Sequence, residues 1–441
     1  MTVAATKTKA EQALSRNFEA VAACLPGSGA VAEARKSAIG TFAALGLPHR
    51  RIEEWKYTDL RVALKDALPP AVGGAAEVSG GAIDGALGAL ARLDAHRIVF
   101  VDGAYSSALS SQADLLGVGI TPLGASLATS SEGKLAREDL ASKEAVIALN
   151  TAFMTDGAIV DVAPGAEMAK PLLLVFARAG KEGRLVTTRN IIKLGAGSRA
   201  TVIEAHVDLC GAGPSQANTL SEVSVDDGAR LAHVKCTLAG DAATHLGSSL
   251  VTLGAKVSYR AFQLTAATAM SRSSVFATLK GEDAKLDISG LFLGRGTQHM
   301  DTTLVIDHAV AGCQSRELFK GVLADRARGV FQGKVIVRPD AQKSDGKQMA
   351  QVLMLSPDAE FDSKPELEIY ADDVLCGHGS TAAEIDKDML FYLRARGIPV
   401  DEARALLIES FIGEALDKVE DERLREALGV RAKQHLGQLS G

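Results

Sequence analysis

The chain has 441 residues, of which 47% are hydrophobic and 23% are charged, and its formal net charge is −6. This length suffices for one large core or for two to three domains, and the hydrophobic content excludes a disordered chain. The acidic balance, without any basic block, argues against a nucleic-acid-binding protein. Only 4% of the residues are aromatic whereas 43 are glycine, so the composition favours short strands with tight turns.

The cysteines and the N-terminal residues indicate the cellular compartment in which the protein is expected. Five cysteines without a CxxC pair are typical of free thiols in a reducing environment. Residues 1–18 lack the apolar core of a signal peptide, and the longest apolar run, residues 171–177, is too short to cross a bilayer. We therefore expect a soluble cytoplasmic protein without a membrane partner.

The N-terminal region, residues 1–94, reads as helices followed by a linker. Apolar residues recur every three or four positions over residues 10–45, and the sequence PGSG separates two predicted helices. The segment HRRIEEWKYTDL, residues 49–60, contains the only tryptophan, Trp55. It is either a helix start held by its aromatic side chains or a binding patch, and its residues favour the structural role. Residues 69–93 are rich in Gly and Ala and indicate a linker or a loosely packed region.

Residues 95–380 carry a degenerate repeat of an aliphatic strand, a short turn with Gly or Asp, and a second strand. Its separations of 32, 31, 28, 26, 44 and 32 residues fall mostly in the range of solenoid proteins. We therefore predict a β-helix whose ends must be capped or paired with another subunit, while a β-sandwich remains an alternative. The repeat occurs at Val162, Leu194, Val225, Leu253, Leu279, Leu323 and Leu355.

Helical periodicity returns after Ala382, so residues 381–441 are predicted to form a C-terminal helical domain. One stripe of this domain contains Ile408, Phe411 and Ile412. A stripe of this kind is more typical of packing within the chain than of a docking surface.

The stretch DDVLCGHGST, residues 372–381, places Cys376 and His378 two positions apart. Residues at i and i+2 of an extended chain point to the same face, so a thiolate and an imidazole can reach one metal together. Gly377 between them has no side chain that would block a close approach. Because a tetrahedral site usually needs four ligands, the others would come from another chain. The alternative is a buried cysteine and a hydrogen-bonded histidine at a strand end.

The usual motifs of enzyme chemistry are absent from the sequence, including the phosphate-binding GxxxxGK[ST], GxGxxG between strand and helix, GxSxG and HExxH. A polar concentration occurs at residues 298–314, but no spacing in it identifies a metal or acid–base site. It contains His299, Asp301, Asp307, His308 and Cys313.

Three parts of the sequence together resemble a known family. They are HRRIEEWKYTDL, the strand-rich middle, and residues 321–419, which include FQGKVIVRPDAQKSDGKQMAQ and IYADDVLCGHGSTAAEIDKDMLFYLRARGIPVDEA. These stretches resemble the SufD family of the SUF iron–sulfur cluster assembly machinery, over nearly the whole chain. In its length, its small number of cysteines and the stretch RIEEWKYT, the chain is more similar to SufD than to its paralogue SufB.

The resemblance implies a right-handed parallel β-helix between N-terminal and C-terminal helical regions, in a non-enzymatic scaffold subunit. It implies pairing with a SufB-like paralogue through the β-helices, and binding of a SufC-like ABC ATPase through C-terminal helices that include Leu390, Tyr392 and Phe411. The Cys and His of the family motif fall on Cys376 and His378. They would hold a transient iron–sulfur cluster shared with the partner, with no permanently bound cofactor.

Two rival functions remain open beside this expectation. A β-helix carbohydrate-active enzyme would need carboxylates aligned on one face of the solenoid. A homodimeric structural protein would have no metal role.

Overall fold

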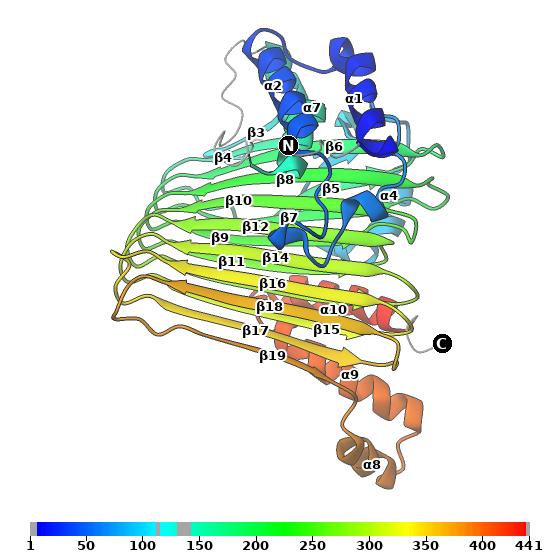
Figure 1. Cartoon of the computed structure of the whole chain (residues 1–441), viewed down its shortest axis with the longest axis vertical. Helices are drawn as coiled ribbons and strands as arrows, with labels where there is room; N and C mark the ends of the chain where they lie inside the picture. The colour runs from blue at the N-terminus through cyan, green and yellow to red at the C-terminus, as the bar shows by residue number, and fades with distance from the viewer. Residues whose placement is uncertain (1–6, 112–114, 130–142, 438–441) are drawn as a thin grey trace, which may run out of the picture.

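The computed structural model describes residues 7–111, 115–129 and 143–437, and its body is a coil of strands wound into two long sheets, A and B (Figure 1). In spatial order, sheet A contains β18 (Glu360–Ile369), β16 (Arg328–Val337), β14 (His299–His308), β12 (Met270–Leu279), β10 (Thr244–Leu253), β8 (Ser215–Val225), β6 (Arg184–Leu194), β4 (Ala158–Val162) and β3 (Val118–Pro122). Sheet B contains β19 (Gly377–Ala383), β17 (Asp345–Met354), β15 (Gln314–Leu323), β13 (Lys285–Gly294), β11 (Ser258–Ala266), β9 (Arg230–Leu238), β7 (Arg199–Asp208), β5 (Leu172–Arg178), β1 (His96–Val101) and β2 (Ala104–Tyr105).

Each coil places one strand in each sheet, and strands of successive coils pair in parallel. Gln216 pairs with Thr244 and Thr244 with Met270, so these coils are 28 and 26 residues long. Among the strand pairs that the structure describes, only β1–β2 and β3–β4, at the N-terminal end, are antiparallel. The parallel β-helix predicted from the repeat is confirmed, and the alternative of a β-sandwich is excluded.

The repeat spacing needs one correction. The expected turns at residues 162, 194, 225, 253 and 279 follow strands of sheet A and lie on one edge of the solenoid, which we call the first rim. Leu323 and Leu355 follow β15 and β17 of sheet B, so they lie on the opposite rim. The separation of 44 residues was therefore measured between two turns that lie on different rims. The next turn of the first rim follows His308, which pairs with Leu279 and lies 29 residues after it.

Backbone hydrogen bonds connect the turns of the first rim to one another. Gly197 has a φ of 68°, and its amide donates to the carbonyl of Asp227 in the next coil at 2.9 Å. Lys256 has a φ of 54° and donates to Glu282 at 2.8 Å. For a residue other than glycine, this left-handed conformation costs about 1–2 kcal/mol. Glycine is therefore favoured at several turn positions, which explains why Gly recurs between the strand segments of the sequence.

Alternating side chains of both sheets fill the interior of the solenoid, as the period of a strand requires. They include Val202, Val251, Leu286, Ile288, Ile306 and Val335. Aromatic rings fit where glycine leaves room. A Cβ at Gly290 would lie 2.5 Å from the Phe319 ring, and one at Gly321 would lie 2.1 Å from the Phe292 ring. These glycines are therefore packing residues of the core.

The N-terminal helices cover the outer face of sheet A (Figure 1). Trp55 is buried there, with the Arg272 guanidinium of β12 only 3.8 Å from its ring centroid. Arg272 also donates to the Glu54 carbonyl at 2.7 Å, which confirms the structural role expected for this segment. The elements are α1 (Lys9–Val21), α2 (Ala30–Leu45), α3 (Leu60–Ala63) and α7 (Ala145–Phe153), with 3₁₀ turns Ala22–Cys24 and Glu53–Trp55. The 3₁₀ turn Ser107–Leu109 and α5 (Leu123–Thr129) come between α3 and α7 in the sequence.

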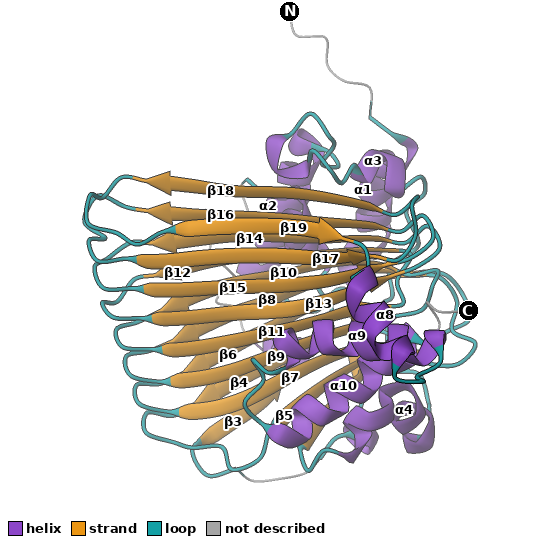
Figure 2. Cartoon of the chain, turned by 90° about the horizontal axis from the view of Figure 1, so that it is seen from below, coloured by secondary structure: helices purple, strands orange, loops and turns teal. Residues whose placement is uncertain are grey.

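A second group of helices covers the outer face of sheet B (Figure 2). It consists of α4 (Gly80–Leu87), the 3₁₀ helix Gly88–Arg92, α9 (Val400–Leu416) and α10 (Glu422–Leu436). Ile83, Leu87 and Leu90 are buried in this layer, so the expectation of a loose linker over residues 69–93 is wrong for its second half. The remaining helix, α8 (Lys387–Ala395), projects beyond the last coil (Figure 1). Within the described parts of the chain, we find no helix with the length and apolarity needed to span a bilayer.

Candidate functional site at the terminal coil

The last strand of sheet B, β19, lies beside β17 (Figure 2). His378 is the second residue of β19, and Cys376 comes directly before the strand. His378 pairs with Gln348 of β17, and Gly377 pairs with Lys347. Cys376 precedes the strand and packs against the interior core, with its Sγ 3.6 Å from the position that a Cβ at Gly346 would occupy. By the alternation of the strand, both residues belong to the inward-facing set.

The two side chains differ in exposure and in protonation. Cys376 is half-buried whereas His378 is exposed. Burial raises the pKa of the Cys376 thiol; a hydrogen bond from the Gly346 backbone opposes this rise, and the charges of Asp345 and Glu317 add to it. The thiol is therefore protonated at neutral pH. Because the thiolate is the metal ligand, binding of a metal here would release a proton.

The inward-facing residues of sheet B change character toward this end of the solenoid. One column, formed by residues paired across successive strands, runs from Ala261 to Ile288, Glu317, Gln348 and finally His378. The neighbouring column becomes smaller, from Tyr259 and Leu286 to Ser315 and Gly346, before it ends at Cys376. The last coils therefore replace large apolar side chains by polar and small ones.

Glu317 and Gln348 are buried, and within the described chain no hydrogen bond of acceptable geometry reaches their carboxyl oxygens or amide atoms, although the Ser315 hydroxyl lies close enough to lower the pKa of Glu317. The nearby Ser315 hydroxyl is engaged with His308 Nε2 at 3.1 Å. Burial raises the pKa of Glu317 to about 8, so this residue is a neutral acid at pH 7. Unpaired buried polar groups are rare in folded proteins, and each one calls for a specific explanation.

The same strands border a cavity of about 400 Å³, and the inward-facing Glu317, Gln348, Cys376 and His378 are among its lining residues. Gly377 and Gly379 of β19 and Lys418, which follows α9, also line it. Arg316 in this cavity is paired with Asp345 at 2.5 Å. Its other lining residues include Asp287, Leu318, Lys347 and Met349.

The described part of the chain does not form a complete metal site by itself. Among the residues that the structure describes, no group of three or more His, Cys, Asp or Glu side chains is arranged to hold a metal ion. Cys376 and His378 thus supply two candidate ligands, and their role as metal ligands stays a prediction.

The polar concentration at residues 298–314 is not brought together by the fold. His299 accepts or donates a hydrogen bond at 2.8 Å with Thr58 on the outer face of sheet A, where Asp301 pairs with Arg272 at 2.5 Å. His308 faces the interior, and the Cys313 thiol donates to the Gly281 carbonyl at 3.4 Å. These residues therefore belong to separate structural contacts.

The C-terminal residues proposed for partner binding fall into two groups. Tyr392 of α8 is 50% exposed and its neighbour Phe391 is 72% exposed, whereas Leu390 is half-buried. Phe411 of α9 is half-buried, and the Lys320 ammonium of β15 lies 4.3 Å from its ring centroid. Phe411 therefore attaches α9 to sheet B, and the exposed aromatic surface belongs to α8.

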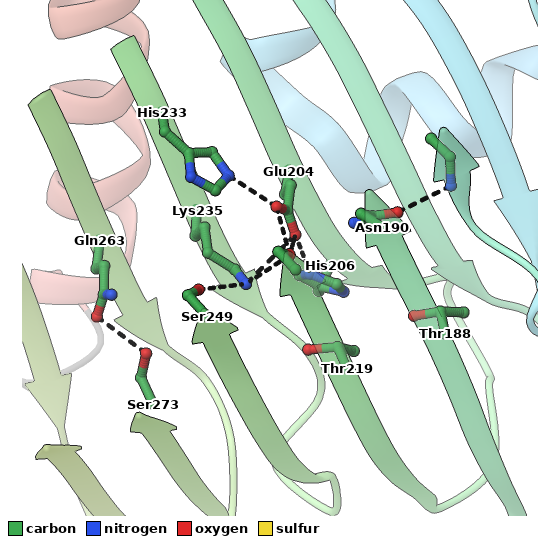
Figure 3. Close-up of polar contacts among 12 residues, drawn as sticks. Thr188, Asn190, Glu204, His206, Thr219, His233, Lys235, Ser249, Gln263 and Ser273 are labelled. Atoms are coloured by element: carbon green, nitrogen blue, oxygen red, sulfur yellow. Dashed lines mark hydrogen bonds and ion pairs between the residues drawn. The ribbon is translucent and has the colours of Figure 1, made fainter. Parts of the chain in front are cut away.

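A buried polar cluster in the middle of the solenoid was not anticipated from the sequence (Figure 3). The Glu204 carboxylate accepts hydrogen bonds from Ser221 and from His233 Nε2, both at 2.7 Å, and lies 3.4 Å from the Lys235 ammonium. The Tyr259 hydroxyl bonds His233 Nδ1 at 3.0 Å. The sequence does contain a signal for this cluster, because ATVIEAHV and RLAHVKCTL each place a charged residue at an inward position of an apolar strand.

Comparison with known proteins decides the family. A family model described as "SUF system FeS cluster assembly, SufBD core domain" matches residues 176–411, and one described as "SufBD protein N-terminal region" matches residues 9–174. The chain belongs to the SufBD family. These two matches cover the β-helix and the N-terminal helices that pack on it.

Individual SufBD-family proteins are similar over most of their length. The chain is 32% identical to the iron–sulfur cluster assembly protein SufD of Escherichia coli K12 over 395 residues, which cover 89% of this chain and 90% of that protein. It is 30% identical to a SufBD family protein of Synechocystis over 414 residues, or 90% of each chain. Bacillus subtilis SufD is 26% identical over 284 residues, or 64% of each chain. The resemblance to SufD is thereby confirmed.

Proposed function

We propose that this SufBD-family chain is a non-catalytic scaffold subunit of a SUF iron–sulfur cluster assembly complex, in which it holds a nascent cluster transiently. The observation that carries this proposal is the placement of Cys376 and His378 together on the inward side of the last coil. A thiolate and an imidazole are suitable iron ligands, and two of them leave a tetrahedral site half complete. The cluster is therefore a cargo shared with a second subunit, and is not a resident cofactor.

The end of the solenoid supports pairing with a SufB-like paralogue. Strands β18 and β19 each have a hydrogen-bonded neighbour on one side only. Ile369, Tyr370 and Leu375 of the same coil are 41%, 60% and 70% exposed. Unpaired strand edges and exposed apolar side chains favour association with another chain. A second copy of this chain would use the same edge when the paralogue is absent.

Helix α8 supports binding of a SufC-like ATPase, which would supply the ATPase activity of the complex. Met389, Phe391 and Tyr392 are exposed on a helix that projects away from the body (Figure 1). Five free cysteines agree with a reducing compartment, so we place the complex in the cytoplasm.

The first test is purification of the tagged chain from its native cells under anaerobic conditions, with the partners identified by mass. We expect an ABC-type ATPase and a β-helix paralogue. Recovery of the chain without either partner at native expression would contradict the scaffold function.

The second test measures iron in the purified assembly of the double variant C376A/H378A. We expect a loss of bound iron with unchanged partner recovery, because both ligands of this subunit are removed. The matched control is C24A, which removes an exposed cysteine far from the terminal coil. Iron content equal to that of wild type in C376A/H378A would exclude these residues as ligands.

The third test addresses α8 with the variant F391A/Y392A. We expect loss of the ATPase while the paralogue is retained, and V430A serves as a control because Val430 is an exposed apolar residue on α10. Substitution is preferable to deletion of the C-terminal helices, because α9 and α10 cover the apolar outer face of sheet B. ATPase recovery unaffected by F391A/Y392A would exclude α8 as the docking element.

A further inference from the structure

We propose that Gln348 and Glu317 are positioning residues that orient the His378 imidazole for the cargo metal. The inference rests on the function proposed above, because it takes His378 as a ligand of the nascent cluster. It adds two residues from earlier coils to a site that the sequence motif confines to β19.

The first observation is the register of the coils. Glu317 pairs with Gln348, and Gln348 pairs with His378, so the three side chains follow one another on the inward-facing side of sheet B. In earlier coils this column holds Ala261 and Ile288, which belong to the apolar core. On the other side of Ala261 the column holds His233, which is bonded to Glu204 and Tyr259. After Ala261 and Ile288 the column becomes polar again at Glu317 and Gln348, directly behind His378.

The second observation is the lack of hydrogen-bond partners. Glu317 is 2% exposed and Gln348 is 3% exposed, yet none of their four polar side-chain atoms forms a hydrogen bond of acceptable geometry with the described residues. In the middle of the same interior, Gln263 accepts a hydrogen bond from Ser273 at 3.0 Å (Figure 3). Single unpaired atoms also occur elsewhere in the described residues, for example His206 Nε2 and Ser198 Oγ, whereas Glu317 and Gln348 are two side chains that are neighbours in register. A buried group without a partner costs stability, which a ligand-dependent role explains.

The third observation is the space around the amide. Gln348 Oε1 lies only 2.3 Å from the position that a Cβ at Gly333 would occupy, so glycine on the opposite sheet accommodates this side chain. Gln348 and His378 also line the same cavity of about 400 Å³. The amide therefore borders free space that it shares with the imidazole.

These observations define an order of hydrogen bonds. A metal-bound imidazole usually donates its second N–H to an outer acceptor, which sets its tautomer and its orientation. Gln348 Oε1 would accept this N–H, and Gln348 Nε2 would donate to a carboxyl oxygen of Glu317. In this arrangement the Gln348 amide and the Glu317 carboxyl group each obtain a hydrogen-bond partner.

The experiment uses the tagged assembly as purified, with Fe²⁺ alone titrated anaerobically into wild type, Q348L, E317L and the control Q263L. We expect the apparent Fe²⁺ affinity of the Cys376-dependent site to fall about tenfold in Q348L and E317L and to stay unchanged in Q263L. E317Q keeps an acceptor oxygen and should bind Fe²⁺ as wild type does. Thermal unfolding of the same chains should show Q348L and E317L to be as stable as wild type or more stable, because no hydrogen bond is lost.

Unchanged Fe²⁺ affinity in Q348L and E317L would overturn the positioning role, whatever their thermal stability. If a leucine variant does not fold, Q348M and E317M replace it, because methionine adapts to irregular space. C376A and H378A separate the two hypotheses. If they leave Fe²⁺ binding intact, the proposed function fails; if they abolish it while Q348L and E317L do not weaken it, only the positioning role fails.

Discussion

Two glutamates are buried inside the same solenoid, one in its middle and one near its end, and their surroundings differ. Burial alone would raise the pKa of Glu204, but the Lys235 ammonium and two imidazoles hold that pKa well below its usual range. For Glu317 burial outweighs the Ser315 hydroxyl and the Arg316 guanidinium, which both lower its pKa, and raises the pKa to about 8. Glu204 is therefore a charged member of a structural network, whereas Glu317 is a neutral acid at pH 7.

The difference shows how a β-helix accommodates polar residues in its core. Where a side chain of the next coil supplies an opposite charge or a hydroxyl group, the polar residue contributes to the packing. Where no partner is supplied, the residue is a local defect that weakens the fold. Glu317 and Gln348 are neighbours in register directly behind His378, which is the basis for assigning them to the site.

The largest expected effect comes from breaking the middle network. In K235M the Glu204 carboxylate loses its ammonium partner while it stays buried, so we expect the free energy of unfolding to fall by about 3–5 kcal/mol. Urea unfolding of the purified chain measures this change. The double variant E204Q/K235M should recover part of the loss, since it leaves no unpaired charge. Equal stability of K235M and wild type would show that the cluster is not held by this ion pair.

An intermediate effect is expected from E317L, and it depends on pH. The folded pKa of Glu317 lies above the value of about 4.3 for an unfolded chain, so the folded state binds the extra proton between these two values. Wild type therefore loses stability as the pH rises from about 5 to 8. The advantage of E317L should grow over this window by at most about 1.4 kcal/mol per pH unit.

Urea unfolding at pH 5, 6.5 and 8 measures the E317L effect. Q263L is its matched control, because neither Gln263 nor its partner Ser273 titrates in this range, so the loss of stability in Q263L should stay constant across the window. A constant difference between E317L and wild type from pH 5 to 8 would contradict the raised pKa of Glu317.

The smallest effect distinguishes the two buried glutamines. Q263L leaves the Ser273 hydroxyl without its acceptor, so a loss of about 1 kcal/mol is expected. Q348L removes no hydrogen bond, so its free energy of unfolding should equal or exceed that of wild type. The same urea titrations give both values, and a larger loss in Q348L than in Q263L would mean that the Gln348 amide has a structural partner.

Much of the fold follows from local pattern. Alternating aliphatic residues with Gly or Asp at regular turns predict short strands in a coil, and helical spacing at both ends predicts the flanking helices. The spacing of Cys376 and His378 predicts that they share a face, because the period of an extended chain is two residues. Each of these inferences depends on residues close together in the sequence.

The sequence by itself thus determined the β-helix, its helical ends and the Cys-Gly-His motif. Only the tertiary structure decided that Lys235 reaches Glu204, that the segment around Ile83 is packed against sheet B, and that Glu317 and Gln348 stand behind His378. The physical reason is register. Residues about 30 positions apart become neighbours only when the coils stack, and the length of each turn sets which of them meet.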